Sequence, residues 1–288
     1  TIIDERGVRL THALDRLEVD VYTDAVDLTI GRQGITWGKS SVFPVADLWS
    51  RFSPFDFDTE KKPGVDAIRA LVYPNMSTEL DLVIADRGSV EDLSGGARFA
   101  GTLGKVDLYG AAGKFWDEIL VMGGVSVVLS RMKLRAEVVG PFNLDLAEVE
   151  LPRATTGVEW FGTDFTLGAE YHFNGIGAAS ASNYSEQLTS AEFLRGESYF
   201  LGRHYGGLYG SYDGVPDVKM NFSAISNFVD PSLIVSPMVE YEVAQNATIG
   251  LGALISAGQE PALQGVPNLR SEFGSYGNFY FAELAAYF

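Results

Sequence analysis

The sequence contains no cysteine, which excludes disulfide bonds and thiolate-ligated metal ions. Basic residues are also scarce: 21 Lys and Arg stand against 38 Asp and Glu, giving a formal net charge of −17. This charge argues against a nucleic-acid partner, because phosphate binding needs clustered cations. Only His12, His172 and His204 provide imidazoles, and the chain has no GxSxG, HExxH, P-loop or EF-hand motif. The sequence therefore predicts no metal site, no cofactor and no enzymatic activity.

Long apolar runs are missing as well. The longest, Ile119 to Leu129, is interrupted by Gly123 and Gly124 and is too short for a membrane-spanning helix. Helical periodicity is weak, and the 32 glycines are scattered through the apolar segments. Strands of about 9–11 residues can also cross a membrane when they close into a barrel, so a β-barrel remains compatible with this composition.

Alternation of apolar and polar residues is abundant. Between Met132 and Val139, for example, apolar residues alternate with Lys133, Arg135 and Glu137, which is typical of a strand with two different faces. The pattern predicts fifteen strands, over residues 8–22, 26–38, 64–73, 78–87, 96–103, 106–116, 118–129, 132–140, 154–162, 164–173, 203–213, 216–229, 232–246, 247–259 and 277–288.

Short turns and long connections alternate between these strands, as in outer-membrane barrels. The sequence therefore predicts an all-β fold: one transmembrane antiparallel up-and-down β-barrel of about 14–16 strands over residues 1–288. Bacterial barrels have even strand numbers, so either one strand is split or missed among these fifteen or a further strand precedes Thr1, and the second alternative is favoured. The last strand ends on Phe288, a terminal aromatic typical of outer-membrane proteins. The alternative is a soluble β-sandwich.

The segment Leu28–Pro74 contains the pattern GRQxIxWG followed by KPGVDxxR, with Arg32, Trp37, Asp66 and Arg69 among its residues. It resembles porin-like outer-membrane β-barrel families of proteobacteria, including alginate-export-like relatives. The resemblance covers about a sixth of the chain. It implies a β-barrel in the Gram-negative outer membrane. The two arginines are expected to form structural ion pairs with Asp66 or with carboxylates of the following loop.

Two connections stand out by length and composition. Residues 39–63 are rich in aromatic side chains and are too apolar for a loop surrounded by water. They are predicted to fold inward as a constriction loop, or alternatively to pack as an outer lid. The acidic rim of such a constriction would comprise Asp47, Asp56, Asp58 and Glu60. Residues 174–203, rich in Ala, Ser and Asn, are predicted to form a long outer loop.

If the apolar faces contact lipid, the polar faces line the lumen. The predicted lining residues are Arg16, Glu18, Asp20, Glu79, Asp81, Lys133, Arg135, Glu137, Glu159, Glu170, His172, Lys219, Glu240, Glu242 and Glu283. Carboxylates outnumber Lys and Arg in this set, and acidic rings favour cations in a hydrated pore. A weak cation preference follows, although these charges are also compatible with simple bridging between strands.

The function predicted from these features is passive diffusion of small hydrophilic solutes through a porin-like channel. One alternative is a structural or export barrel within a larger outer-membrane complex, for example for polysaccharide passage. Another is an outer-membrane hydrolase that uses His172 or His12. The expected partners are outer-membrane lipids and lipopolysaccharide, the barrel-assembly machinery through Phe288, and either another protein or further copies of the chain.

Overall fold

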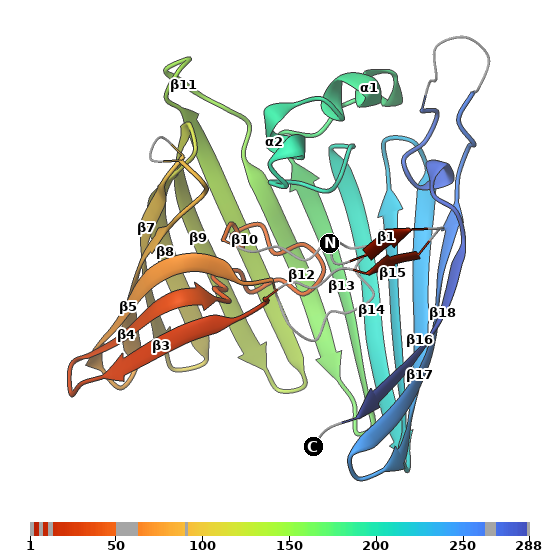
Figure 1. Ribbon diagram of the computed structural model, residues 1–288, viewed down its shortest axis with the longest axis horizontal. Helices are drawn as coiled ribbons and strands as arrows, with labels where there is room; N and C mark the ends of the chain where they lie inside the picture. The colour runs from red at the N-terminus through yellow and green to blue at the C-terminus, as the bar shows by residue number, and fades with distance from the viewer. Residues whose placement is uncertain are drawn as a thin grey trace.

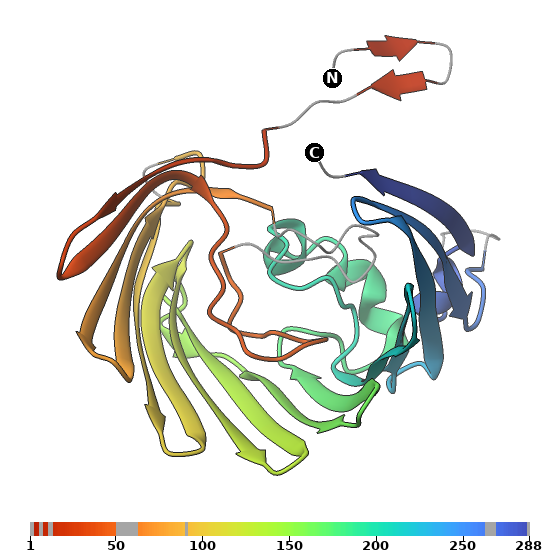
Figure 2. The same cartoon turned by 90° about the horizontal axis from the view of Figure 1, so that it is seen from below.

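The computed structural model describes residues 3–5, 8–10, 14–49, 63–89, 92–262 and 269–286. Its main element is one antiparallel sheet that curls into an incomplete barrel (Figures 1 and 2). From edge to edge its strands are β3 (Leu17–Tyr22), β4 (Val26–Gln33), β5 (Val65–Asn75), β6 (Thr78–Ala85), β7 (Ser94–Leu103), β8 (Val106–Phe115), β9 (Glu118–Leu129), β10 (Met132–Asn143), β12 (Arg153–Phe161), β13 (Phe165–Asn174), β14 (His204–Val215), β15 (Val218–Asn227), β16 (Ser232–Ala244), β17 (Ala247–Ala257) and β18 (Phe279–Ala286).

Three shorter strands lie outside this series. Strand β11 (Glu148–Val149) extends the sheet beside the end of β10. Strands β1 (Ile3–Glu5) and β2 (Val8–Leu10) pair only with each other, in a hairpin that lies apart from the sheet in Figure 2. The all-β up-and-down fold predicted from the alternation is thus confirmed, and each of the fifteen predicted segments overlaps one strand of the series.

Two predicted strands differ most in length from the observed ones. The first, 8–22, is divided, because β2 pairs with β1 and the sheet begins only at Leu17. The second, 26–38, ends at Gln33. Beyond this point the backbone N–H groups of Trp37 and Gly38 donate to the Asp47 carboxylate, both at 2.8 Å, instead of continuing the ladder. The chain turns inward as a result.

Tight turns connect the strands at one end of the barrel, and longer connections gather at the other (Figure 1). Positive φ angles at Gly104, Ser130 and Asp217 allow three of these tight turns to reverse the chain within two residues. Proline has no N–H to donate, so the ladder between β16 and β17 lacks residue pairs at Pro237 and at the position before it. The register of the two strands is nevertheless the same on both sides of Pro237.

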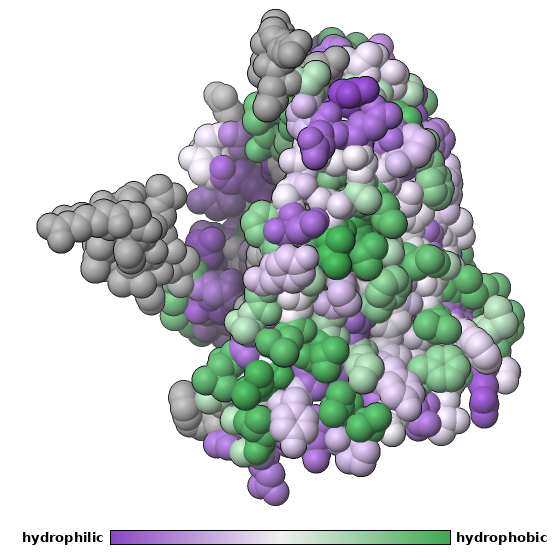
Figure 3. All heavy atoms as spheres, turned by 90° about the vertical axis from the view of Figure 1, so that its right-hand side faces the viewer, coloured by the Kyte–Doolittle hydropathy of each residue, from purple (hydrophilic) through white to green (hydrophobic). Residues whose placement is uncertain are grey.

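The outer face of the sheet is apolar and exposed. Leu82, Ile84, Val121 and Val138 all point outward and are at least 40% exposed. Figure 3 shows apolar side chains gathered over the middle and lower wall formed by the last strands, with hydrophilic side chains near the top. Such a belt is unfavourable in water and is typical of a surface that contacts lipid.

The inner face is not uniformly polar, contrary to the expectation from sequence. Towards the end that carries the long connections, β5 to β10 turn apolar side chains inward, including Val65, Val83, Leu120 and Val139. These side chains are buried against the segment that follows β4. The barrel therefore encloses a small hydrophobic core of its own in addition to polar residues.

The connection between β13 and β14 carries the short helices η1 (Ala181–Asn183), α1 (Tyr184–Gln187) and α2 (Ala191–Leu194). The Ser190 hydroxyl caps α2 by accepting a hydrogen bond from Phe193 N–H. A further 3-10 turn, η2 (Phe273–Ser275), precedes β18. No helix among the described residues is long and apolar enough to cross a membrane.

The sheet is open between its edge strands. Within the described residues, β3 pairs only with β4 and β18 pairs only with β17. As the first and fifteenth members of an antiparallel series, β3 and β18 run in the same direction. One more strand, antiparallel to both, would complete an even-numbered barrel.

Candidate functional site

The segment after β4, residues 34–49, enters the barrel and is here called the inward loop (Figure 2). Its side chains Trp37, Leu48 and Trp49 pack on the apolar inner faces of β5 to β10. At its far end Phe43 packs against Phe200 and Tyr205, with ring centroids 5.3 and 6.2 Å away. The inward loop thus crosses the lumen from one wall towards the other.

Glu137 on β10 holds the near half of the inward loop. Its two carboxylate oxygens accept hydrogen bonds from Lys39 N–H at 2.5 Å and from Ser40 N–H at 3.0 Å. Tyr109 on β8 donates its hydroxyl to the same carboxylate at 2.8 Å. Glu137 is 3% exposed, so its role is to anchor backbone rather than to face water.

Glu170 on β13 holds the far half. Its carboxylate accepts three backbone N–H groups, from Ser41 at 2.7 Å, Val42 at 2.9 Å and Phe43 at 3.0 Å. Glu170 is 4% exposed. Two wall carboxylates therefore satisfy five consecutive N–H groups of a segment that has no strand partner.

Arg135 balances part of this buried negative charge. Its guanidinium donates to the Lys39 carbonyl at 3.0 Å and to the Ser41 hydroxyl at 2.7 Å. It also donates to Glu159 at 2.6 Å and to the Tyr209 hydroxyl at 2.7 Å. One arginine thereby connects the inward loop to β12 and β14 through four hydrogen bonds, and a buried ion needs partners of this kind to be stable.

A second set of polar contacts fixes the root of the inward loop. Trp37 donates its indole N–H to Asp81 at 2.8 Å, and Arg69 donates to both oxygens of that carboxylate at 3.0 and 2.7 Å. Asp47 is 1% exposed and accepts hydrogen bonds from the backbone N–H groups of Trp37 and Gly38.

The predicted acidic rim therefore does not include Asp47, because its carboxylate closes a turn inside the loop. Asp56, Asp58 and Glu60 lie outside the described residues.

The residues of the GRQxIxWG and KPGVDxxR pattern separate into two groups. Trp37 and Arg69 meet on the inner face through Asp81. Arg32 and Asp66 stand opposite each other on β4 and β5 as an exposed ion pair at 3.4 Å. An exposed pair of this kind stabilises the fold little, so the inner group accounts for more of the local structure.

Several predicted channel-lining residues are buried under the inward loop. Asp81, Arg135, Glu137, Glu170 and His172 point inward as expected, but each is at most 5% exposed. The alternation gave their direction correctly, whereas it contained no information about the segment that covers them. They position the inward loop and do not border open water.

His172 also fits a structural role better than a catalytic one. Its ring stacks on Phe43 with centroids 5.0 Å apart, and its Nδ1 lies 3.1 Å from the Thr155 hydroxyl. His204 hydrogen-bonds to the Tyr171 hydroxyl at 2.7 Å. His12 lies outside the described residues. The described part of the chain contains no group of three or more His, Cys, Asp or Glu side chains placed to hold a metal ion.

Most of the remaining predicted lining residues stay accessible, whereas Glu159 is paired with Arg135. Glu79, Lys133 and Glu240 are half-buried, and Lys219 and Glu242 are exposed. On β15 and β16, Lys219 stands directly opposite Glu240. Arg16, Glu18 and Asp20 lie on or beside the edge strand β3 and are exposed.

Below the inward loop a polar cavity of about 300 Å³ lies against β5 to β7. Its lining includes Lys39, Thr78, Glu79, Arg98 and Thr102. Arg98 donates to Glu79 at 2.5 Å, and burial lowers the pKa of the Lys39 ammonium. Lys39 and Arg98 were not among the lining residues predicted from the sequence, although the alternation of β7 places Arg98 on the inner face.

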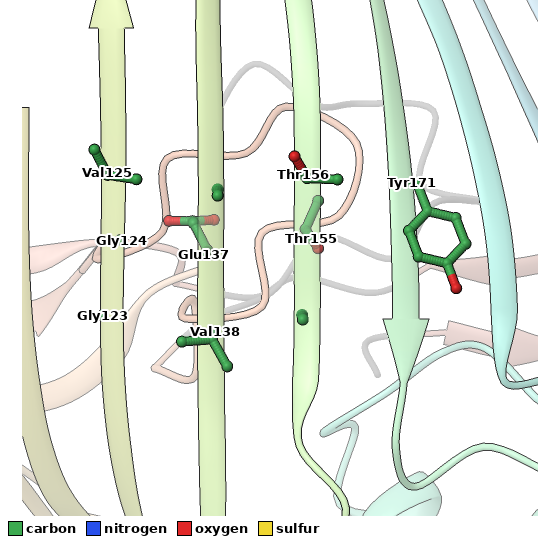
Figure 4. Close-up of a pocket in the computed structure, with 10 residues that line it drawn as sticks. Gly123, Gly124, Val125, Glu137, Val138, Thr155, Thr156 and Tyr171 are labelled. Carbon is green, nitrogen blue, oxygen red and sulfur yellow. The ribbon is translucent and has the colours of Figure 1, made fainter.

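The outer wall has a different, apolar depression of about 550 Å³ over β9, β10, β12 and β13. Figure 4 shows Val125, Val138, Thr156 and Tyr171 around it, with Glu137 directed towards the inward loop behind the strands. This depression lies on the face opposite the polar cavity, and the one charged residue in its lining, Glu137, bonds to the inward loop, so the depression is no part of the candidate site.

No protein-family model matches this sequence, and no curated protein matches it. Solved structures of outer-membrane porins do match the fold. Pseudomonas aeruginosa OccK5 (OpdH) superimposes with a TM-score of 0.59 at 7% identity, over 94% of this chain and 81% of that chain. OccD3 (OpdP) from the same organism gives 0.58 at 11%, over 94% and 77%, and OpdL gives 0.60 at 9%, over 93% and 78%. The chain has the fold of these porins.

Replacing Glu170 by Ala should release the far half of the inward loop, because three buried N–H groups lose their acceptor. We expect a loss of about 3 kcal/mol in the free energy of unfolding, together with faster hydrogen exchange at Ser41 to Phe43. Urea unfolding and mass-spectrometric exchange measure both effects. The control is Glu242→Ala, which removes an exposed inner carboxylate; an equal effect of both variants would contradict the anchoring role.

Proposed function

We propose that this protein is a channel in the Gram-negative outer membrane for passive diffusion of small hydrophilic solutes. The porin fold and the apolar outer belt support the location. The single observation that carries the proposal is the inward loop, which is anchored across the lumen by Glu137 and Glu170 above a polar cavity. An inner segment that the wall holds in this way narrows the lumen and restricts the passage of solutes by their size, as a constriction does.

We further propose a weak preference for cations. The carboxylates that anchor the inward loop are buried and contribute little to the accessible charge. Among the accessible inward groups, Glu79, Glu240 and Glu242 accompany Lys39, Lys133 and Lys219. Glu18, Asp20 and Glu283 add three exposed carboxylates near the seam, against Arg16. The balance remains acidic, which favours cations in a hydrated lumen.

A second candidate function is favoured by the open seam between β3 and β18. A barrel component completed by a further strand would suit a larger outer-membrane complex. The resemblance of the Leu28–Pro74 segment to alginate-export-like proteins agrees with polysaccharide passage through such a complex. The proposed partners in either case are outer-membrane lipids, lipopolysaccharide, and the assembly machinery that would bind Phe288.

Planar-bilayer recordings test the channel directly. We expect steady openings from the purified protein and a reversal potential that favours K⁺ over Cl⁻ in a salt gradient. Glu240→Gln together with Glu242→Gln should move this ratio towards unity, because two accessible inner carboxylates lose their charge. The control Asp117→Asn alters a carboxylate paired with Arg195 at the outer end. Absence of conductance would instead favour the component of a larger complex.

A matched pair of valines tests the orientation of the wall. Val138 points outward and is 46% exposed, whereas Val128 points inward opposite Lys133 and is 41% exposed. Val138→Arg should lower the free energy of unfolding in lipid vesicles by about 2–4 kcal/mol, since the arginine enters hydrocarbon. Val128→Arg should change it little. Similar costs at both positions would contradict a lipid-facing outer wall.

A further inference from the structure

A buried polar network lies where the outer connections meet the ends of β14, β15 and β16. It consists of Tyr184, Tyr205, Asn227, Asp230 and Glu272. The central member is Glu272, which is fully buried although it belongs to a connection between strands. We call residues 175–203 the lid and residues 269–276 the latch segment.

Glu272 accepts hydrogen bonds from three separate elements. One carboxylate oxygen accepts Leu201 N–H of the lid at 3.0 Å. The other accepts the Tyr205 hydroxyl of β14 at 2.5 Å and the Asn227 amide of β15 at 2.7 Å. The side chain thus connects the latch segment, the lid and the wall at one point.

Asp230 forms the second half of the network. Its carboxylate accepts the Tyr184 hydroxyl of α1 at 2.6 Å and Glu272 N–H at 2.7 Å. The Asn227 amide, 3.1 Å away, donates to Asp230 as well as to Glu272. Two carboxylates therefore share one amide donor, and both hold the lid against the ends of the strands.

The network contains two acids and no base. In the part of the chain that the structure describes, no Lys, Arg or His side chain donates a hydrogen bond to Glu272 or Asp230. Arg203, next to β14, donates instead to the Gly177 carbonyl at 3.0 Å. His172 on β13 lies 6.3 Å from the Tyr205 ring and stacks on Phe43.

Burial without a cation makes the charged form of Glu272 unfavourable. Desolvation raises the pKa of Glu272 to about 7, and Asp230 adds to this rise, while the hydrogen bonds from Tyr205, Leu201 and Asn227 oppose it. Burial also raises the pKa of Tyr184 and Tyr276, which stay neutral in this range. Glu272 therefore changes charge near neutral pH.

The opposite end of the lid is held differently. Arg195 pairs with Asp117, and Arg153 lies 3.5 Å from Glu197. These ion pairs join the lid to β12 and to the connection before β9. Arginine keeps its charge throughout the relevant pH range, so this end provides a fixed attachment.

We propose that Glu272 is a proton-operated latch: its neutral form keeps the lid docked on β14 to β16, and its ionisation loosens that edge while the arginine-paired edge stays attached. Docking of the lid is a property separate from the proposed channel function, and the latch operates whether or not solutes pass beneath the lid.

The direction of the pH effect follows from linkage. The docked state holds Glu272 with a raised pKa, whereas an undocked, hydrated Glu272 titrates near its ordinary value. At pH values below the ordinary pKa of a glutamate, the docked state keeps its full stability. This stability is lost as the pH rises through about 7, the raised pKa of Glu272. Between pH 5 and pH 8 we expect the docking equilibrium to fall on the order of a hundredfold.

Hydrogen exchange at Leu201 N–H, which donates to Glu272, measures docking without requiring channel activity. The detergent-solubilised full chain would be compared at pH 5 to 8, with rates divided by the intrinsic exchange rate at each pH. We expect the protection factor at Leu201 to fall with rising pH, and Glu272→Gln to abolish this dependence. The control Glu260→Gln, an exposed acid on the same connection, should leave the wild-type profile unchanged.

Asp230→Asn provides a variant that retains Glu272. Removing the neighbouring negative charge should shift the midpoint of the Leu201 profile to lower pH, whereas a merely structural loss would reduce protection at every pH. Protection that does not vary with pH in the wild type would overturn the proposal, and so would wild-type pH dependence in Glu272→Gln. Missing bilayer conductance with an intact Leu201 profile would refute only the proposed channel.

Discussion

The structure depends on one constraint: every backbone N–H and C=O group away from water needs a hydrogen-bond partner. In the wall, neighbouring antiparallel strands meet this need, which explains the up-and-down order from β3 to β18. The inward loop packs on strands but forms no ladder of backbone hydrogen bonds with any strand of the described residues. Glu137 and Glu170 take the place of a ladder by accepting its five N–H groups from Lys39 to Phe43. The wall thereby supplies the acceptors that let a segment without regular structure remain in the lumen.

The same constraint explains how far the sequence predicts the fold. Period-two alternation locates each strand, because the two faces of the wall meet different surroundings over its whole length. It fails at residues 34–38, where alternation continues but the backbone leaves the sheet. Trp37 retains the pattern of a strand residue, yet its N–H donates to Asp47 ten residues later. An apolar side chain on the inner face indicates that another segment covers the wall at that point. The sequence alone does not reveal which segment this is.

The sequence predicted which face of the strands the residues of the candidate site occupy, but it did not predict what these residues do. Glu137 and Glu170 stand on the polar faces of their strands, which the alternation shows, and a hydrated lumen was the simplest surrounding for them. Their burial depends on a segment about 130 residues earlier in the case of Glu170 and Ser41. Lys39 and Arg98 were missed because their significance lies in a cavity beneath that same segment. Long-range contacts of this kind leave no local pattern in a single sequence.

The open seam limits what can complete the wall. Since β3 and β18 run in the same direction, pairing them directly would join parallel strands and break the antiparallel order. Further copies of the chain in the same membrane orientation present edges of that same direction, so two copies cannot pair β3 or β18 in antiparallel fashion either. A strand that runs opposite to both edges satisfies both rows of N–H and C=O groups at once. Its outward side chains are expected to be apolar, because the exposed Leu17, Val19 and Leu284 beside it continue the apolar outer face of the sheet.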